Sequence, residues 1–304
     1  MIIRALLDRF WVLLGVITLV FFLTALVPGD PVDVMLGERA TGADRESLRI
    51  SLGLDKPIVE RWSAYVLNVM QGDLGDSLLK QRPVIDLIQE RLPATFQLAI
   101  LSFAIVVIIA IPLGSYAARK HQQFGDHAAT VFALLGQSIP NFWLGPMLVL
   151  LFSIYLAWLP ISGNETWQHI ILPALTLGFS MTAIAVRMLR SSLLEILHQD
   201  WMRTARAKGG AESQVFWRHA VPNAMIPVLT LLSLQLGALL SGAVITEVVF
   251  SWPGIGSLLI DAIQQRDYLL IQGVVLVIAI LYIVINLVTD MLLGWIDPRI
   301  EARA

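Results

Sequence analysis

The chain has 304 residues, of which 57% are hydrophobic and 14% are charged, and its formal net charge at pH 7 is −2. Soluble domains average about 25% charged residues, so this composition predicts a polytopic membrane protein. Because the sequence contains no cysteine, it excludes disulfide scaffolds, cysteine-ligated zinc, iron–sulfur clusters and thiol catalysis by this chain.

Six apolar stretches predict membrane-spanning helices, each of which needs about 20 mostly apolar residues. They cover residues 10–27, 95–117, 128–159, 170–186, 224–246 and 269–289. The first leads into Pro-Gly-Asp-Pro and lacks a signal-peptide cleavage pattern, so we interpret it as a retained helix. The third is too long for one straight span and contains Pro140 and Pro146, which predicts a kinked or broken helix. The predicted fold class is therefore all-α, with six transmembrane helices.

The distribution of lysine and arginine predicts the orientation of these spans. Twelve basic residues lie at the two termini, after the second span and between the fourth and fifth spans. The short loops at about residues 160–169 and 247–268 contain only Arg266. Positive charge in short loops marks the cytoplasmic side, so both termini are expected there.

The segment 28–93 between the first two spans is long and lies outside by this orientation. Alternation of apolar and polar residues in RESLRISLGL and PIVERWSAYVLNVM predicts short amphipathic helices. Glycine-containing signals such as GDLGD predict turns between them.

No motif in the sequence predicts catalysis. A nucleotide-binding G-x-x-x-x-G-K-[ST] is absent, as are H-E-x-x-H and G-x-S-x-G. The five histidines are scattered along the chain, so we predict neither a metal site nor catalytic residues. They are His121, His127, His169, His198 and His219.

Uncharged polar residues inside the spans predict either a translocation pathway or hydrogen bonds between helices. Gln137, Ser138 and Asn141 cluster beside Pro140, and Gln235 lies in the fifth span. Both interpretations remain open. Because no series of buried carboxylates and histidines suggests a proton relay, a self-contained ion-coupled transporter is the weaker hypothesis.

The segment between the fourth and fifth spans is basic and amphipathic. Helical periodicity in DWMRTARAKGG places Trp201, Ala205 and Lys208 on one face, and Gly209-Gly210 predicts the end of the helix. A second short helix in ESQVFWRHAV leads to Pro222. Such a segment suits docking into a groove of another protein or binding to anionic lipid.

This segment resembles the cytoplasmic coupling motif of the permease subunits of ATP-binding-cassette importers. That motif reads E-A-A, three residues, Gly, nine residues and I-x-L-P. Arg203, Thr204 and Ala205 occupy the E-A-A positions, Gly209 falls on the glycine and Pro222 on the proline. The glutamate and the first alanine of the motif are replaced.

Further stretches resemble the peptide/nickel subgroup of these permeases along nearly the whole chain. In order they are PGDP, LGLDKP, QGDLGDSLLKQRPV, LPAT, IPNFWLG, RTARAKG, HAVPNAMIP, EVVFSWPGIGSLLIDAIQQRDYLLIQG and IDPR. The resemblance implies the type I importer permease fold in the bacterial inner membrane. It also implies import of di-/oligopeptides, glutathione, nickel or metal chelates.

The resemblance further implies four kinds of partner and a division of the chain. A second permease would complete the channel in the membrane lipid, two cytoplasmic ATPases would bind ATP and magnesium, and a periplasmic binding protein would deliver substrate; no nucleic acid is expected. The division is an N-terminal transmembrane helix (1–27), a periplasmic helical segment (28–93), a five-helix core (94–296) with the coupling region 200–222, and a cytoplasmic tail (297–304).

Two sets of site residues follow from the resemblance. ATPase coupling is expected at Trp201, Arg203, Thr204, Ala205, Lys208, Gly209 and Pro222. An outer gate or binding-protein contact is expected at Phe250, Trp252, Pro253 and Gly254, for which a structural re-entrant turn is the alternative.

Overall fold

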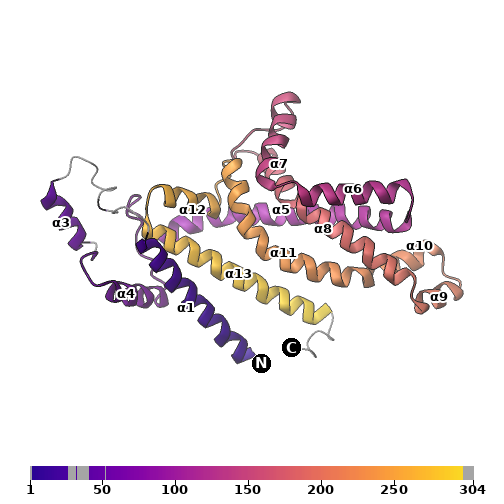
Figure 1. Cartoon of the computed structure of the whole chain (residues 1–304), viewed down its shortest axis with the longest axis horizontal. Helices are drawn as coiled ribbons and strands as arrows, with labels where there is room; N and C mark the ends of the chain where they lie inside the picture. Colours follow the sequence, from indigo (N-terminus) through magenta and orange to yellow (C-terminus); the bar gives the residue numbers. More distant parts are fainter. Residues whose placement is uncertain (1, 27–31, 33–40, 52, 297–304) are drawn as a thin grey trace. The chain divides into compact units, whose positions relative to one another are not determined.

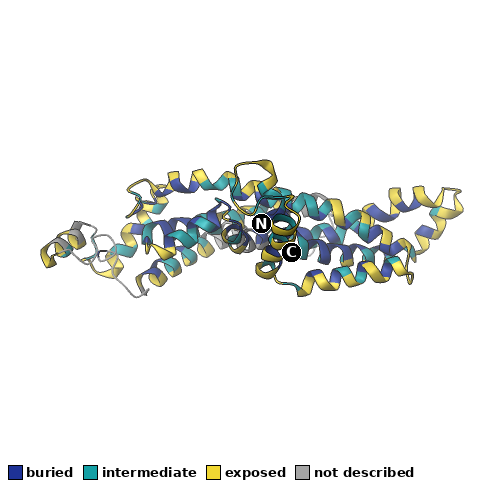
Figure 2. Cartoon of the chain, turned by 90° about the horizontal axis from the view of Figure 1, so that it is seen from above, coloured by how far each residue is buried: buried dark blue, intermediate teal, exposed yellow. Residues whose placement is uncertain are grey.

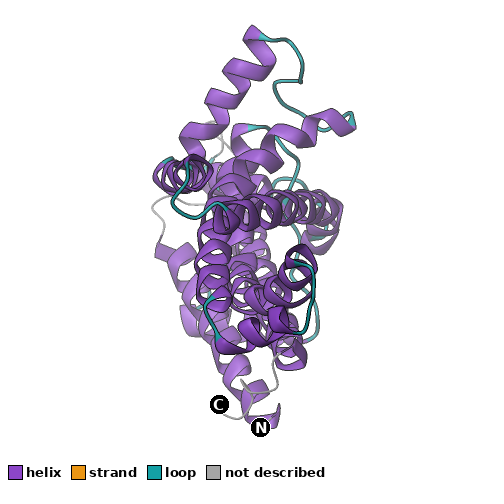
Figure 3. Ribbon diagram, turned by 90° about the vertical axis from the view of Figure 1, so that its right-hand side faces the viewer, coloured by secondary structure: helices purple, strands orange, loops and turns teal. Residues whose placement is uncertain are grey.

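The computed structural model describes residues 2–26, 32, 41–51 and 53–296. Its described part is helical, with no strand and one isolated bridge between Asp76 and Pro83 (Figure 3). The α-helices are α1 (Ile2–Leu26), α3 (Gly42–Ser51), α4 (Ile58–Met70), α5 (Val84–Arg119), α6 (Phe124–Ser138), α7 (Asn141–Leu148), α8 (Ile171–Leu197), α9 (Asp200–Ala207), α10 (Glu212–Val215), α11 (Val221–Val249), α12 (Ile255–Gln264) and α13 (Tyr268–Ile296) (Figure 1). Residues Pro28–Pro31, which close the first predicted span, and the predicted tail 297–304 lie outside the described residues.

Helices occupy all six predicted spans. By length and composition, four stretches of the described chain can each cross a membrane: Val84–Arg119, Trp167–Leu197, Glu212–Gly237 and Tyr268–Thr289. The first predicted span contains the shorter apolar helix Trp11–Ala25. The third is a pair, Phe124–Ser138 and Asn141–Tyr155, bent by 108°. The all-α polytopic fold class is confirmed.

The break predicted in the third span falls at Pro140. Proline restricts the preceding residue to an extended conformation, and Ile139 has φ −87° and ψ 118°. Pro140 then precedes the first turn of α7, and the chain continues as a π-helix over Val149–Tyr155. The prediction of a broken helix is therefore confirmed.

Two of the helices extend well beyond their apolar stretches. α5 begins at Val84, so the predicted domain boundary at residue 93 falls inside it. α8 continues past residue 186, where the apolar stretch ends, to Leu197. Arg190, which lies between the fourth and fifth apolar stretches, is therefore part of α8. The helix persists because Leu193 and Ile196 remain buried on its inner face.

The chain forms two compact units, Met1–Thr95 with Pro253–Ile283, and Phe96–Trp252 with Val284–Ala304. Along the helices of each unit, buried and exposed positions alternate around the helix axis (Figure 2). In the second unit α8 packs against α6, α7 and α11. Small residues permit close approach: a Cβ on Gly136 of α6 would lie 2.4 Å from the Cβ of Ala183 on α8.

The first unit has its own core, formed by α1, α4, the start of α5, α12 and the start of α13. Its buried members include Phe21, Tyr65, Ile88 and Leu270. Buried Asp267 joins the loop before α5 to this core, because it accepts hydrogen bonds from the Ser77 hydroxyl (2.5 Å) and from the backbone amide of Leu270 in α13 (3.2 Å).

Candidate functional site

The basic segment 200–222 folds as two short helices joined by a glycine turn. α9 ends at Ala207, and Gly209 follows in the left-handed conformation with φ +84°. Most L-residues avoid this conformation, so glycine is required here by the backbone. The second helix runs from α10 through a π-helical turn, Phe216–Ala220, into α11, where Pro222 stands in the first turn. The predicted helix–glycine–helix arrangement is confirmed.

The two faces of α9 differ sharply in burial. Met202 is fully buried, whereas Trp201 is 40% exposed and its indole N–H donates to the side-chain carbonyl of Gln199. The predicted face of α9, with Trp201, Ala205 and Lys208, lines one cleft of about 470 Å³. The other lining residues are Thr204, Gly210, Gln214, Val215 and His219. The two short helices therefore line a common cleft.

The exterior of this segment carries positive charge. Arg203, Arg206 and Lys208 are all exposed. Arg203 lies 3.5 Å from Asp200, and Arg206 lies 3.8 Å from Glu212. Exposed ion pairs of this kind contribute roughly 0–1 kcal/mol, so they leave the side chains free to exchange partners.

The segment is attached to the helices around it by buried contacts. Phe216 is 4% exposed, and the guanidinium of Arg119, the last residue of α5, lies 5.1 Å from its ring centroid. Trp217 packs edge-on against Phe216 with 5.5 Å between ring centroids. The second short helix is therefore fixed to the end of α5 by an aromatic pair and a cation–π contact.

A buried ion pair holds the helix that leads into α9. Arg190 of α8 donates to both carboxylate oxygens of Asp126 in α6, one of them through Nη2 at 2.8 Å. The backbone amide of Gln122 also donates to Asp126 (2.9 Å), and the Nδ1 atom of His121 lies 3.2 Å away. The Asp126 side chain is 3% exposed. Sequence reasoning missed this pair because its members are 64 positions apart.

The predicted pathway residues fall into two places. Gln137, Ser138 and Asn141 meet at the bend between α6 and α7. Gln137 and Ser138 are exposed, and they donate to the carbonyls of Ala133 (3.3 Å) and Leu134 (2.9 Å) of their own helix. These bonds do not join helices.

Gln235 lies elsewhere in the second unit. It lines an open cavity of about 670 Å³ with Met188, Ile226, Pro227, Thr230, Leu231 and Leu234. None of the other predicted pathway residues lines this cavity, so the structure does not bring all four together.

The residues of the predicted outer gate are mostly buried within the chain. Phe250 is 1% exposed, its ring packs against Gly145, and its carbonyl accepts a hydrogen bond from Gly163 (3.0 Å). Trp252 is 4% exposed, Pro253 is half-buried and Gly254 is buried. This burial favours the alternative of a structural turn for Phe250 and Trp252, and a gating role stays a prediction. Within the described residues, no three His, Asp or Glu side chains gather as a metal site.

Comparisons with known proteins cover the chain almost from end to end. Residues 110–302 match the family described as Binding-protein-dependent transport system inner membrane component, and residues 1–99 match its N-terminal counterpart. The chain is 43% identical to the Glutathione transport system permease protein GsiC of Pectobacterium atrosepticum, over 99% of this chain and 98% of that protein. It is 42% identical to GsiC of Escherichia coli strain K12, over 99% of both.

The fold also matches a solved structure. An inward-facing form of the MetNI methionine ABC transporter aligns with a TM-score of 0.59 and 16% identity, over 69% of this chain and 96% of that chain. The fold and the family matches define a multi-pass inner-membrane permease of the ATP-binding-cassette importer class. The chain belongs to the peptide/nickel family of these permeases. It is a non-catalytic subunit, and ATP hydrolysis resides on a separate subunit of such transporters.

Proposed function

We propose that this permease imports small peptides of the glutathione class, delivered by a periplasmic binding protein. The observation that carries the proposal is the 42–43% identity, along whole chains, to permeases of glutathione transport systems. Nickel or a metal chelate is the second candidate substrate from the resemblance. Among the described residues, no three His, Asp or Glu side chains gather as a site for a bare metal ion. A metal ion that arrives already chelated would not need such a site.

We assign coupling to the ATPases to the segment 200–222. Its contact residues are Trp201, Arg203, Thr204, Ala205, Lys208, Gly209 and Pro222. An exposed tryptophan and three exposed cations beside a cleft are typical of a surface that binds another protein. Both termini and this segment face the cytoplasm, where the partner ATPases bind ATP and magnesium.

In this mechanism, ATP-driven closure of the ATPases brings together the coupling segments of this chain and of a second permease. The membrane helices then move as rigid bodies, the pathway opens to the outside and accepts substrate, and it reopens inward after hydrolysis. The pathway residues proposed are Gln137, Ser138, Asn141 and Gln235.

The identity of the substrate is tested by measuring uptake in a strain that lacks the gene for this permease and in the same strain with the gene restored. Labelled glutathione, a labelled dipeptide and nickel-63 are supplied in parallel, with either ATP or the ion gradient depleted. We expect glutathione or dipeptide uptake that fails without ATP and survives loss of the gradient. Uptake of nickel-63 without uptake of either peptide would mean that the substrate is nickel and not a small peptide. Uptake that depends on the ion gradient and not on ATP would support an ion-coupled transporter.

Coupling is tested by co-purification with the ATPases after Gly209→Glu. Gly72→Glu is the matched control, because Gly72 also has a left-handed backbone (φ +83°) and open space at the Cβ position. The two variants carry the same backbone strain and the same charge change. We expect the ATPases to be lost with Gly209→Glu only. Retention by both variants, with normal stimulated hydrolysis, would refute the assignment.

A further inference from the structure

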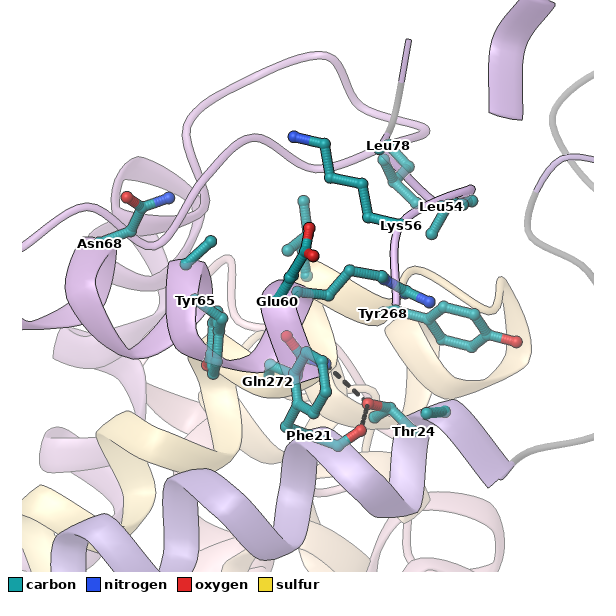
Figure 4. A pocket seen from close by; sticks show the side chains of 15 residues that line it. Phe21, Thr24, Leu54, Lys56, Glu60, Tyr65, Asn68, Leu78, Tyr268 and Gln272 are labelled. Carbon is teal, nitrogen blue, oxygen red and sulfur yellow. Dashed lines mark hydrogen bonds between the residues drawn. The ribbon is translucent and has the colours of Figure 1, made fainter. Parts of the chain in front are cut away.

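The first unit contains a cavity of about 420 Å³ at the end of α1. Its lining comes from the last turns of α1, the loop before α4, α4 itself, the loop before α5 and the start of α13. Figure 4 shows Lys56 on one side of the cavity and Phe21, Thr24 and Gln272 on the other, with Glu60 between them. All of its lining residues belong to the first unit.

The floor of the cavity is ordered and mainly apolar. Phe21 of α1 and Tyr65 of α4 stack with ring centroids 5.8 Å apart. The amide of Gln272, 6% exposed, donates to the hydroxyl of Thr24 at 2.7 Å. Burial raises the pKa of the Tyr65 phenol to about 12, so this wall stays uncharged at physiological pH. The other apolar residues of the lining are Ala25, Leu54, Ala64, Leu78 and Leu269.

The lining of the cavity carries an excess of positive charge. Lys56 and Arg61 flank the start of α4, and Glu60 is the only carboxylate in the lining. Among the contacts of the described residues, no ion pair engages Lys56 or Arg61. Arg61 is half-buried, and this desolvation lowers its pKa. Two cations without partners, one of them partly desolvated, favour an anionic ligand.

The cavity continues an apolar surface of the membrane-spanning part of α1. Phe22 is 37% exposed and lies three residues before exposed Ala25, so the two share one face of α1, and in a membrane such a face lies against acyl chains. Ala25 also lines the cavity. Since the apolar helix ends at Ala25, the opening lies at the depth where lipid headgroups meet water.

We propose that this cavity binds the headgroup of an anionic phospholipid, with its phosphate between Lys56 and Arg61 and an acyl chain along the exposed face of α1. A lipid satisfies both halves of the site at once, because it joins an anion to an apolar chain. A free anion leaves the apolar floor unfilled. A zwitterionic peptide, which Glu60 would also accommodate, does not use the adjoining face of α1.

The test uses the intact purified transporter in nanodiscs and in detergent. Native mass spectrometry titrates phosphatidylglycerol against phosphatidylcholine on the wild type and on Lys56→Gln/Arg61→Gln. Each basic residue near a membrane surface strengthens binding of anionic lipid appreciably, so we expect the double variant to bind phosphatidylglycerol roughly tenfold to thirtyfold more weakly. Lys80→Gln/Arg82→Gln removes the same charge outside the cavity lining and should bind as the wild type does.

A third variant keeps the proposal testable if the double variant does not fold. Glu60→Gln removes the single carboxylate of the lining and should tighten binding of phosphatidylglycerol. Equal binding of the two lipids by the wild type, or no change in either cavity variant, would overturn the proposal. So would displacement of the lipid by inorganic phosphate alone or by glutathione, which would assign the cavity to a free anion or to a peptide.

Discussion

The ion pair between Asp126 and Arg190 gives a quantitative prediction about how the segment 200–222, the proposed coupling segment, is held. Arg190 lies ten residues before Asp200, where α9 begins, and its side chain is 23% exposed against 3% for Asp126. Removing one partner of a buried ion pair costs about 3–5 kcal/mol, whereas exposed pairs contribute about 0–1 kcal/mol. Because Arg190 keeps some contact with water, we expect Asp126→Asn to destabilise the second unit by about 3 kcal/mol.

The perturbation is measured by thermal unfolding of the purified transporter and by substrate uptake per folded transporter. At about 2–4 °C per kcal/mol for a unit of this size, the midpoint should fall by roughly 6–12 °C. Arg203→Ala breaks an ion pair whose partners are 77% and 95% exposed, so it is the control and should leave the midpoint unchanged. We expect uptake to fall as well in Asp126→Asn, because the end of α8 is no longer fixed to α6.

Exchanging the two charges distinguishes the contribution of the ion pair to stability from the contributions of the individual residues. Asp126→Arg with Arg190→Asp should recover part of the lost stability, since the two side chains still face each other, although Gln122 then loses its acceptor. An unchanged midpoint in Asp126→Asn would refute the energetic reasoning. If the unfolding midpoint fell while uptake per folded transporter stayed normal, the ion pair would contribute to stability but not to coupling.

Two further predictions concern glycines. Gly136→Ala places a methyl group 2.4 Å from the Cβ of Ala183 and should destabilise the packing of α6 on α8 by about 1–3 kcal/mol. Adding Ala183→Gly removes the clash and should restore most of the lost unfolding midpoint. Gly15→Ala is the control, because a Cβ at Gly15 meets nothing within 4 Å, and it should leave the midpoint unchanged. If Ala183→Gly failed to restore the midpoint, this packing would be contradicted. At the coupling turn, Gly209→Ala should cost about 1–2 kcal/mol through its left-handed backbone alone. Gly209→Asn should cost less by the same thermal measurement, and equal losses from the two substitutions would argue against a backbone cause.

The elements that the sequence predicted well are those with local physical causes. Proline at position 140 acts on its own neighbours, so the break in the third span was predictable to within a residue. The left-handed turn at Gly209 and the amphipathic helices α3 and α4 follow equally from short-range patterns. Each of these features can be predicted from a stretch of fewer than about twenty consecutive residues.

The features that the sequence did not predict depend on contacts between distant residues. Arg190 lies outside the apolar stretch that predicted the fourth span, and Asp126, which compensates its charge in the folded chain, is 64 positions away. The approach of Gly136 to Ala183 and the attachment of Phe216 to Arg119 likewise join separate helices. A single sequence contains the residues of these contacts but not their pairing.

The burial of the coupling segment separates the residues that orient it from those that are open to a partner. α9 has eight residues, too few for a stable isolated helix in water, so its orientation depends on tertiary packing. Met202, Val215 and Phe216 supply that packing, because each is at most 4% exposed. Trp201, next to Met202 in sequence, remains 40% exposed beside the cleft, although burial of a tryptophan is strongly favourable. Truncating Met202, Val215 or Phe216 to alanine should therefore displace the segment and lower the unfolding midpoint. Trp201→Ala should leave the midpoint unchanged and weaken the proposed contact with the ATPases in co-purification.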